Sequence, residues 1–258
     1  MRAAAAVLAR RVGGFLARQV LRIALALGPA VPALAATQTI DLWLAGRETT
    51  VDVFLPAGDP PARPRDAVIL AHGFTRDRGS MTGHAERLAA AGFVVAVPDL
   101  PYYWHSGDNA RALRDLVRML LAGKFAPATP RVVLVGFSAG GLAAVLAADE
   151  PGVAGFIGLD PFDRPGGPGR EAAKKLTVPA YLLRAPSSRC NAYSIAAPWR
   201  EALPKLVADR VFEHATHCDF EWPTDGICRT ACGGTDEGRR KAIADALDAA
   251  VRALLPPS

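Results

Sequence analysis

The chain has 258 residues, half of them hydrophobic, so it can bury a sizeable core and form one large domain. Its formal net charge of +5 comes from residues 1–35, which hold five of the 30 basic residues and none of the 25 acidic ones. Residues 36–258 therefore carry no net charge. This balance argues against a protein that binds nucleic acid or an anionic membrane through a basic surface.

The first 35 residues have the pattern of a secretory leader. Arginines mark its start, an apolar run extends from Ile23 to Leu34, and Ala33-Leu34-Ala35 is a small-x-small cleavage motif. The alternative is an uncleaved anchor, but the run is shorter than a bilayer span. We therefore expect a signal peptide over residues 1–35, a single domain over residues 36–258, and no stable membrane insertion after leader removal. The expected location is secreted or periplasmic.

Four cysteines follow the leader: Cys190, Cys218, Cys228 and Cys232. An even number after a leader is typical of two disulfides in an oxidising compartment. The spacing leaves all three pairings open, and Cys228 and Cys232 can meet across one helical turn. No C-x-x-C pair is present, so we expect no metal site, and the chemistry inferred below requires no cofactor.

The predicted elements alternate between short apolar runs and helical segments. A hairpin of strands 39–44 and 49–55 precedes a proline-rich loop at 59–65. Further strands are predicted at 67–71, 93–97, 132–135, 153–159, 178–183 and 210–214. Helices are predicted at 80–91, 108–121, 142–150, 197–208 and 236–255. This alternation indicates a doubly wound, mostly parallel α/β sheet flanked by helices. Only 18 residues separate Leu159 from Val178, too few for a large cap domain.

The stretch from Arg131 to Gly141, RVVLVGFSAGG, is a strand followed by G-x-S-x-G and a helix. This is the sequence form of a nucleophile elbow, a sharp turn that lifts a serine above the edge of the sheet. Gly136 and Gly140 permit the close approach of strand and helix that such a turn requires. A tight turn needs small residues for packing alone, but the flanking strand and helix favour Ser138 as a nucleophile.

A serine nucleophile needs a histidine base, which in this architecture comes late in the chain. Only His214 and His217 are late enough. His214 falls at a predicted strand end, where a structural role is the simpler interpretation. His217 lies in the loop beyond, so we expect it to be the base.

In this architecture the acid is often found in the segment that begins with the strand predicted at 178–183. Residues 178–200 contain no Asp or Glu, however, so the acid must come from another segment. The preceding strand ends at Asp160, which lies at the carboxyl edge of the sheet, where ligands bind in open α/β sheets. Asp163 is the second choice, although its simpler interpretation is a solvated loop residue. The resulting order, Ser138, Asp160, His217, is that of the elbow architecture.

Two backbone N–H groups are expected to stabilise the oxyanion. One belongs to Ala139, directly after the serine, and the other to Phe74, in the loop after the strand 67–71. His72 is expected to orient that loop through hydrogen bonds. The aromatic residues expected to contact substrate are Tyr102, Tyr103, Trp104 and Phe162.

The chain has four motifs in this order: H-G-F at 72–74, G-F-S-A-G-G at 136–141, I-G-L-D-P-F-D at 157–163 and T-H-C-D-F at 216–220. Together they resemble the chlorophyllase branch of the α/β-hydrolases. Platelet-activating-factor acetylhydrolases and cutinase-like polyesterases are more distant relatives. The resemblance implies an α/β-hydrolase fold and a serine carboxylic-ester hydrolase that forms an acyl-enzyme with a small-molecule or lipid-like ester. An acyltransferase or amidase with the same triad, and a non-catalytic binding protein, are the alternatives.

Overall fold

The computed structural model describes residues 36–57 and 64–256, so the predicted leader lies outside the described residues. The strands are β1 (Ala36–Leu44), β2 (Arg47–Leu55), β3 (Ala67–Ala71), β4 (Val94–Pro98), β5 (Val132–Phe137), β6 (Val153–Leu159), β7 (Ala180–Arg184) and β8 (Leu206–Val211). The α-helices are α1 (Thr82–Ala90), α2 (Ser106–Leu121), α3 (Ala139–Ala147), α4 (Pro168–Lys175), α5 (Trp199–Ala202), α6 (Gly226–Ala231) and α7 (Glu237–Leu254). The 3₁₀ turns are η1 (Arg78–Met81), η2 (Arg189–Asn191) and η3 (His217–Phe220).

The strands form one eight-stranded sheet in the order β1-β2-β4-β3-β5-β6-β7-β8. The hairpin of β1 and β2 is antiparallel, and β2 pairs antiparallel with β4. Every other neighbouring pair, from β4 through β8, is parallel. This confirms the predicted mostly parallel α/β sheet. The carboxyl ends of β3, β5 and β6 therefore meet at one edge, which is where the motif residues lie.

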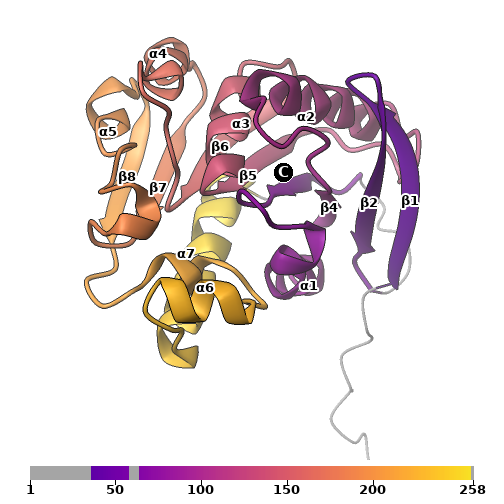
Figure 1. Cartoon of the computed structure of the whole chain (residues 1–258). Coiled ribbons are helices and arrows are strands. Elements are labelled where there is room, and N and C mark those ends of the chain that lie inside the picture. The colour runs from indigo at the N-terminus through magenta and orange to yellow at the C-terminus, as the bar shows by residue number, and fades with distance from the viewer. Residues whose placement is uncertain (1–35, 58–63, 257–258) are drawn as a thin grey trace, which may run out of the picture. The chain divides into compact units, whose positions relative to one another are not determined.

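Helices cover both faces of the sheet, and each face has its own core (Figure 1). The central strand β3 is buried along its whole length because helices pack on both sides. Ala67 and Ile69 contribute to the core under α2 and α3, whereas Val68 and Leu70 contribute to the core under α1 and α7. Such two-sided burial explains why this strand is a continuous apolar run in the sequence.

The predicted helix at 197–208 is wrong over most of its length. Helix α5 ends at Ala202, and β8 begins at Leu206. Pro204 lacks the N–H that a continuing helix needs, and the residues beyond it pair with β7 instead. Because β8 is the edge strand of the sheet and only partly buried, it lacks the continuous apolar pattern of the inner strands. Helix α4 was not predicted at all.

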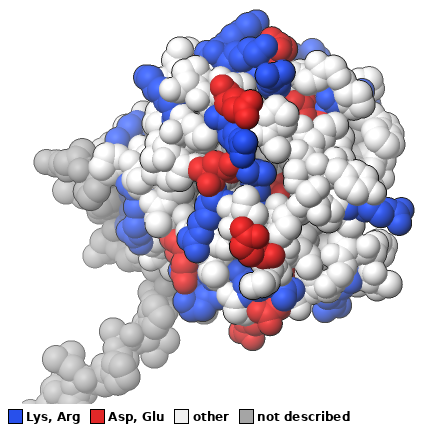
Figure 2. Space-filling model, turned by 90° about the vertical axis from the view of Figure 1, so that its left-hand side faces the viewer, with Lys and Arg blue, Asp and Glu red and all other residues white. Residues whose placement is uncertain are grey.

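None of the described helices has the length and apolar character of a membrane span. Basic and acidic side chains lie interspersed on the face of the molecule shown in Figure 2. Among the described residues, many charged side chains pair across elements: Arg87 of α1, for example, contacts Asp245 and Asp248 of α7. The predicted proline-rich loop at 59–65 falls largely outside the described residues.

Candidate active site

Ser138 lies between β5 and α3 in a backbone conformation that few non-glycine residues adopt, with φ 51° and ψ −121°. Its N–H donates to Leu159 O at 3.1 Å, which ties the turn to the end of β6. A Cβ on Gly136 would collide with the backbone of Gly140, and a Cβ on Gly140 would collide with the backbone of Ala71 and His72 at the end of β3. The first glycine therefore permits the close passage of strand and helix, and the second permits the close approach of the helix start to β3. The local sequence thus produces the strained turn expected of an elbow.

The structure brings Ser138, His217 and Asp160 together from three separate elements. His217 Nε2 lies 3.1 Å from Ser138 Oγ, and His217 Nδ1 lies 2.6 Å from Asp160 Oδ2. A carboxylate can only accept at neutral pH, so Nδ1 carries the proton and Nε2 is free to accept from the serine. His217 and Asp160 are both buried, with 7% and 2% of their surfaces exposed.

Asp160 is oriented by groups that the sequence analysis did not identify. Its Oδ1 accepts from Ala185 N–H at 3.0 Å, and Asn191 Nδ2 lies 3.3 Å from both carboxylate oxygens. Asn191 is itself held, because its Oδ1 accepts from the N–H groups of Ser188 and Ser194. These contacts leave Oδ2 directed at His217. No spacing or motif in the sequence indicates Asn191.

Asp163, the second choice for the acid, does not contact His217 and is not the solvated loop residue that was expected. It is 2% exposed, and Trp199 Nε1 donates to its Oδ2 at 2.7 Å. Its two oxygens also accept from the N–H groups of Gly169 and Arg170 in the first turn of α4. The carboxylate is buried because it caps a helix and receives a buried indole N–H.

His72 orients the loop after β3, in agreement with the role expected of it. Leu100 N–H donates to His72 Nε2 at 2.8 Å, so the ring proton is on Nδ1, which donates to Gly73 O at 2.8 Å. Burial lowers the pKa of His72, which keeps the ring neutral for this pair of contacts. A Cβ on Gly73 would lie 2.9 Å from the Phe137 ring, so glycine permits the close approach of the loop to the elbow.

The N–H groups expected to hold an oxyanion belong to Phe74 and Ala139. Neither donates a hydrogen bond to another described residue. Ala139 is the first residue of α3, where the helix dipole adds partial positive charge. Both residues line the same cleft as Ser138, Phe74 from the loop after β3 and Ala139 from the start of α3.

A cleft of about 570 Å³ opens above Ser138 and His217, and all four predicted aromatic residues line it. Phe74 forms a cluster with Tyr103 and Trp104, with ring centroids 4.7 and 4.4 Å away. Tyr103 and Trp104 are 62% and 66% exposed, so this aromatic surface is open to solvent. Tyr102 is tied down, because its hydroxyl donates to Ala45 O at 2.7 Å.

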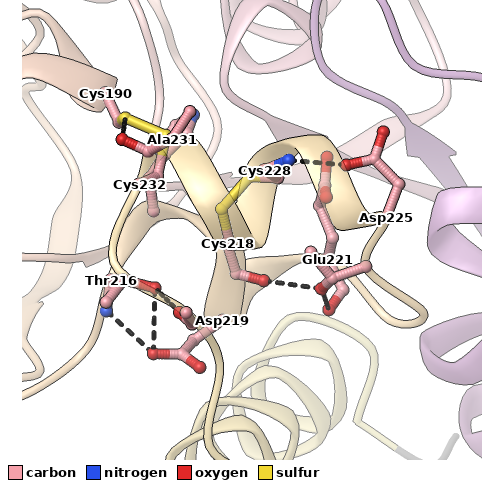
Figure 3. The surroundings of a disulfide bond; sticks show 12 residues. Cys190, Thr216, Cys218, Asp219, Glu221, Asp225, Cys228, Ala231 and Cys232 are labelled. Atoms are coloured by element: carbon pink, nitrogen blue, oxygen red, sulfur yellow. Dashed lines mark hydrogen bonds between the residues drawn. A yellow bond between two sulfur atoms is a disulfide. The ribbon is translucent and has the colours of Figure 1, made fainter.

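The cysteines form the pairs Cys190–Cys232 and Cys218–Cys228 (Figure 3). The possible Cys228–Cys232 pair is therefore wrong, because each of these residues reaches a partner on another segment. The sulfurs of Cys218, Cys228 and Cys232 lie within 4.8 Å of one another. Metals bind thiolates, however, and no cysteine in the described residues is free.

A buried ion pair that the sequence did not indicate connects the H-G-F loop to the segment after His217. Arg76 Nε lies 2.5 Å from Glu221 Oε1, and Arg76 also pairs with Asp225 at 2.9 Å. Glu221 is completely buried, and this burial raises the pKa of its carboxyl despite the attraction of Arg76. The pair joins the loop that carries Phe74 to the turn that carries His217.

The sheet order and the strand–serine–helix turn define the α/β-hydrolase class of folds. A family model described as the alpha/beta hydrolase family matches residues 68–256, most of the chain. The chain therefore belongs to the alpha/beta hydrolase family.

Two known proteins show the range of this similarity. A monoacylglycerol lipase of Mycolicibacterium smegmatis is 32% identical over 117 residues, which cover 42% of this chain and 40% of that lipase. The match thus spans less than half of that relative. The crystal structure of a dienelactone hydrolase from Anabaena variabilis superposes with a TM-score of 0.65 over 84% of this chain and 96% of that one. At 18% identity this second likeness bears on the fold alone.

Proposed function

We propose that this chain is a serine carboxylic-ester hydrolase that acts through an acyl-enzyme. The observation that carries the proposal is the continuous hydrogen-bond chain from Ser138 Oγ through His217 to Asp160, at the floor of an open cleft. Such a chain allows a histidine to take the serine proton during attack and to return it to the leaving group. Membership of the alpha/beta hydrolase family supports the same reaction class.

In the proposed mechanism, Ser138 attacks the ester carbonyl while His217 accepts its proton, and Asp160 stabilises the imidazolium. The N–H groups of Phe74 and Ala139 hold the tetrahedral oxyanion, and each such donor is worth about 3 kcal/mol in the transition state. His217 then protonates the departing alcohol. Water, activated by the same histidine, hydrolyses the acyl-enzyme and regenerates Ser138.

The substrate class we propose is a small-molecule or lipid-like ester with an apolar part. The exposed cluster of Phe74, Tyr103 and Trp104 at the cleft supports this class, because aromatic rings bind apolar groups well. The motif likeness to chlorophyllases and the partial match to a monoacylglycerol lipase point in the same direction. We further propose that residues 1–35 are a signal peptide and that the protein is secreted or periplasmic. The two disulfides are consistent with an extracellular location.

The test is hydrolysis of p-nitrophenyl butyrate by the wild type and by Ser138→Ala. We expect turnover by the wild type, loss of turnover in the variant with an unchanged circular dichroism spectrum, and labelling of the wild type alone by a fluorophosphonate. Turnover retained by Ser138→Ala would refute the nucleophile. A matched p-nitroanilide, and a competing alcohol with product analysis, separate ester hydrolysis from amidase and acyl-transfer activity.

A further inference from the structure

The cleft contains two arginines whose charge is not neutralised. Arg76, Arg164 and Arg189 all line it, and Glu221 is the carboxylate among its lining residues. Arg76 uses its charge on Glu221 and Asp225. Within the described part of the chain, neither Arg164 nor Arg189 has a carboxylate within 4.0 Å. The open cleft therefore carries excess positive charge next to its aromatic cluster.

Both guanidinium groups retain almost all of their hydrogen-bonding capacity. Arg164 Nη1 donates to Trp104 O at a long 3.4 Å, and the side chain of Arg189 has no hydrogen-bond partner among the described residues. A guanidinium has five N–H donors in a planar fork that matches a carboxylate or a phosphate. These two side chains are thus able to bind an anionic group of a ligand without giving up an existing ion pair.

The backbone beneath each arginine is held in place, which lowers the cost of using it for binding. Arg164 N–H donates to Asp163 Oδ1 at 2.8 Å. Arg189 begins η2, which has a capping box formed by Ser188 and Asn191. The next residue, Cys190, is bonded to Cys232. Only the long side chains need to be ordered when a ligand binds.

We propose that the cleft selects esters that carry an ionised oxyanion group, a carboxylate or a phosphate, in addition to the ester bond. Arg164 and Arg189 provide the counter-charges, and the aromatic cluster of Phe74, Tyr103 and Trp104 receives the apolar body. The preferred substrate is then an amphiphilic ester with an anionic group, and not a neutral ester. This inference rests on the proposed function and names the substrate class of the same site.

The experiment compares kcat/KM for two aryl acetates of nearly equal size, 4-acetoxybenzoate and its neutral methyl ester. The carboxylate also changes the leaving group, so the informative quantity is the anionic-to-neutral ratio in the wild type divided by that ratio in Arg164→Gln/Arg189→Gln. Intrinsic reactivity cancels in this comparison. We expect the anionic-to-neutral ratio of kcat/KM to be about tenfold lower in the double variant than in the wild type, mainly through a higher KM for the anion. A second pair, 4-acetoxyphenyl phosphate and 4-acetoxyanisole, separates phosphate from carboxylate recognition.

Arg252→Gln is the matched control, because Arg252 is an exposed arginine on α7 that does not line the cleft. It should leave the ratio unchanged, whereas 0.5 M salt should reduce the wild-type ratio through screening, since the Debye length falls to a few ångström (~4 Å). Equal ratios in the wild type and the double variant for both pairs, with the neutral esters still hydrolysed, would overturn the inference and leave the proposed function intact. If no ester of the set is hydrolysed, the proposed function fails and this inference fails with it.

Discussion

Two aspartates three residues apart at the end of β6 should respond to mutation in opposite ways. Asp163 accepts four hydrogen bonds. Its Oδ1 accepts from the backbone N–H groups of Arg164 and Gly169, and its Oδ2 accepts from the backbone N–H of Arg170 and the indole N–H of Trp199. Asp163→Ala removes the cap of α4 and leaves a completely buried indole N–H without a partner. We therefore expect this variant to lose stability while its remaining folded molecules keep the hydrolytic site.

The size of this loss follows from the contacts. A lost helix cap costs about 1 kcal/mol, and an unsatisfied buried donor such as Trp199 Nε1 costs about 1–3 kcal/mol. A total of about 3 kcal/mol lowers the Tm of a domain of this size by about 6–12 °C. Asp163→Asn should lose nearly as much. An amide has only one acceptor oxygen, so its NH₂ group must face two of the four donors.

Asp160→Asn is the contrasting variant, because its amide keeps an acceptor for Ala185 N–H but can no longer accept from His217 Nδ1. We expect a fall in kcat of about 10⁴-fold, the effect of placing the base in the wrong tautomer, with a small change in Tm. Thermal unfolding by circular dichroism and p-nitrophenyl butyrate hydrolysis at 25 °C measure both properties. The reasoning is refuted if Asp163→Ala unfolds within about 2 °C of the wild type. It is also refuted if Asp163→Asn loses more activity per folded molecule than Asp160→Asn.

Two further predictions concern pH and the disulfides. Burial lowers the pKa of His84 from 6.5 to about 4, so the unfolded chain binds a proton that the fold excludes, and stability is lost as pH falls through this window. The loss of stability should reach about 3 kcal/mol. Between pH 7.5 and 4, the Tm of His84→Gln should depend less on pH than the Tm of the wild type. Equal dependence of Tm on pH in the two proteins would contradict His84 as the cause. Replacing both cysteines of Cys190–Cys232 by alanine should lower Tm more than replacing those of Cys218–Cys228, because the sequence separation is 42 rather than 10. The activity loss should have the reverse order, because Cys218 is adjacent to His217, and the same rank for both properties would contradict this assignment.

The inner part of the fold was predictable because each inner strand is buried on both faces. The bounds of β3 and β6 agree with the predicted strands, since a covered strand is a continuous apolar run. The edge strand β8 was only partly predicted: the predicted strand at 210–214 overlaps its last two residues, and its first residues were assigned to the helix at 197–208, because a partly buried strand lacks the continuous apolar run of the inner strands. Helix α4 was missed for a different reason. Its N-terminus is capped by Asp163, which lies well before Pro168, the first residue of the helix, and reaches it only through the loop between them. The residues next to the helix start therefore contain no capping motif that would have indicated it.

The candidate triad was predictable from local patterns and the order of the chain, but the groups that hold it were not. Ser138 lies in a local motif, and Asp160 was reached because residues 178–200 contain no acid. Asn191 contacts Asp160 across 31 residues, and Arg76 contacts Glu221 across 145 residues. Contacts of this kind depend on how segments are brought together in space. The sequence has no periodicity or spacing that records them.

The disulfides link these long-range contacts to the proposed chemistry. Cys218 directly follows His217, and Cys190 directly precedes Asn191, the residue that orients Asp160. Both partners of these cysteines lie in or directly after α6, so one short helix anchors the base-bearing turn and the acid-supporting turn together (Figure 3). The proposed nucleophile Ser138 needs no such anchor, because it lies directly between β5 and α3, two regular elements. We therefore attribute the cysteine-rich segment to positioning: the proposed acid and base lie on irregular loops, and covalent links replace the rigidity that regular structure provides for Ser138.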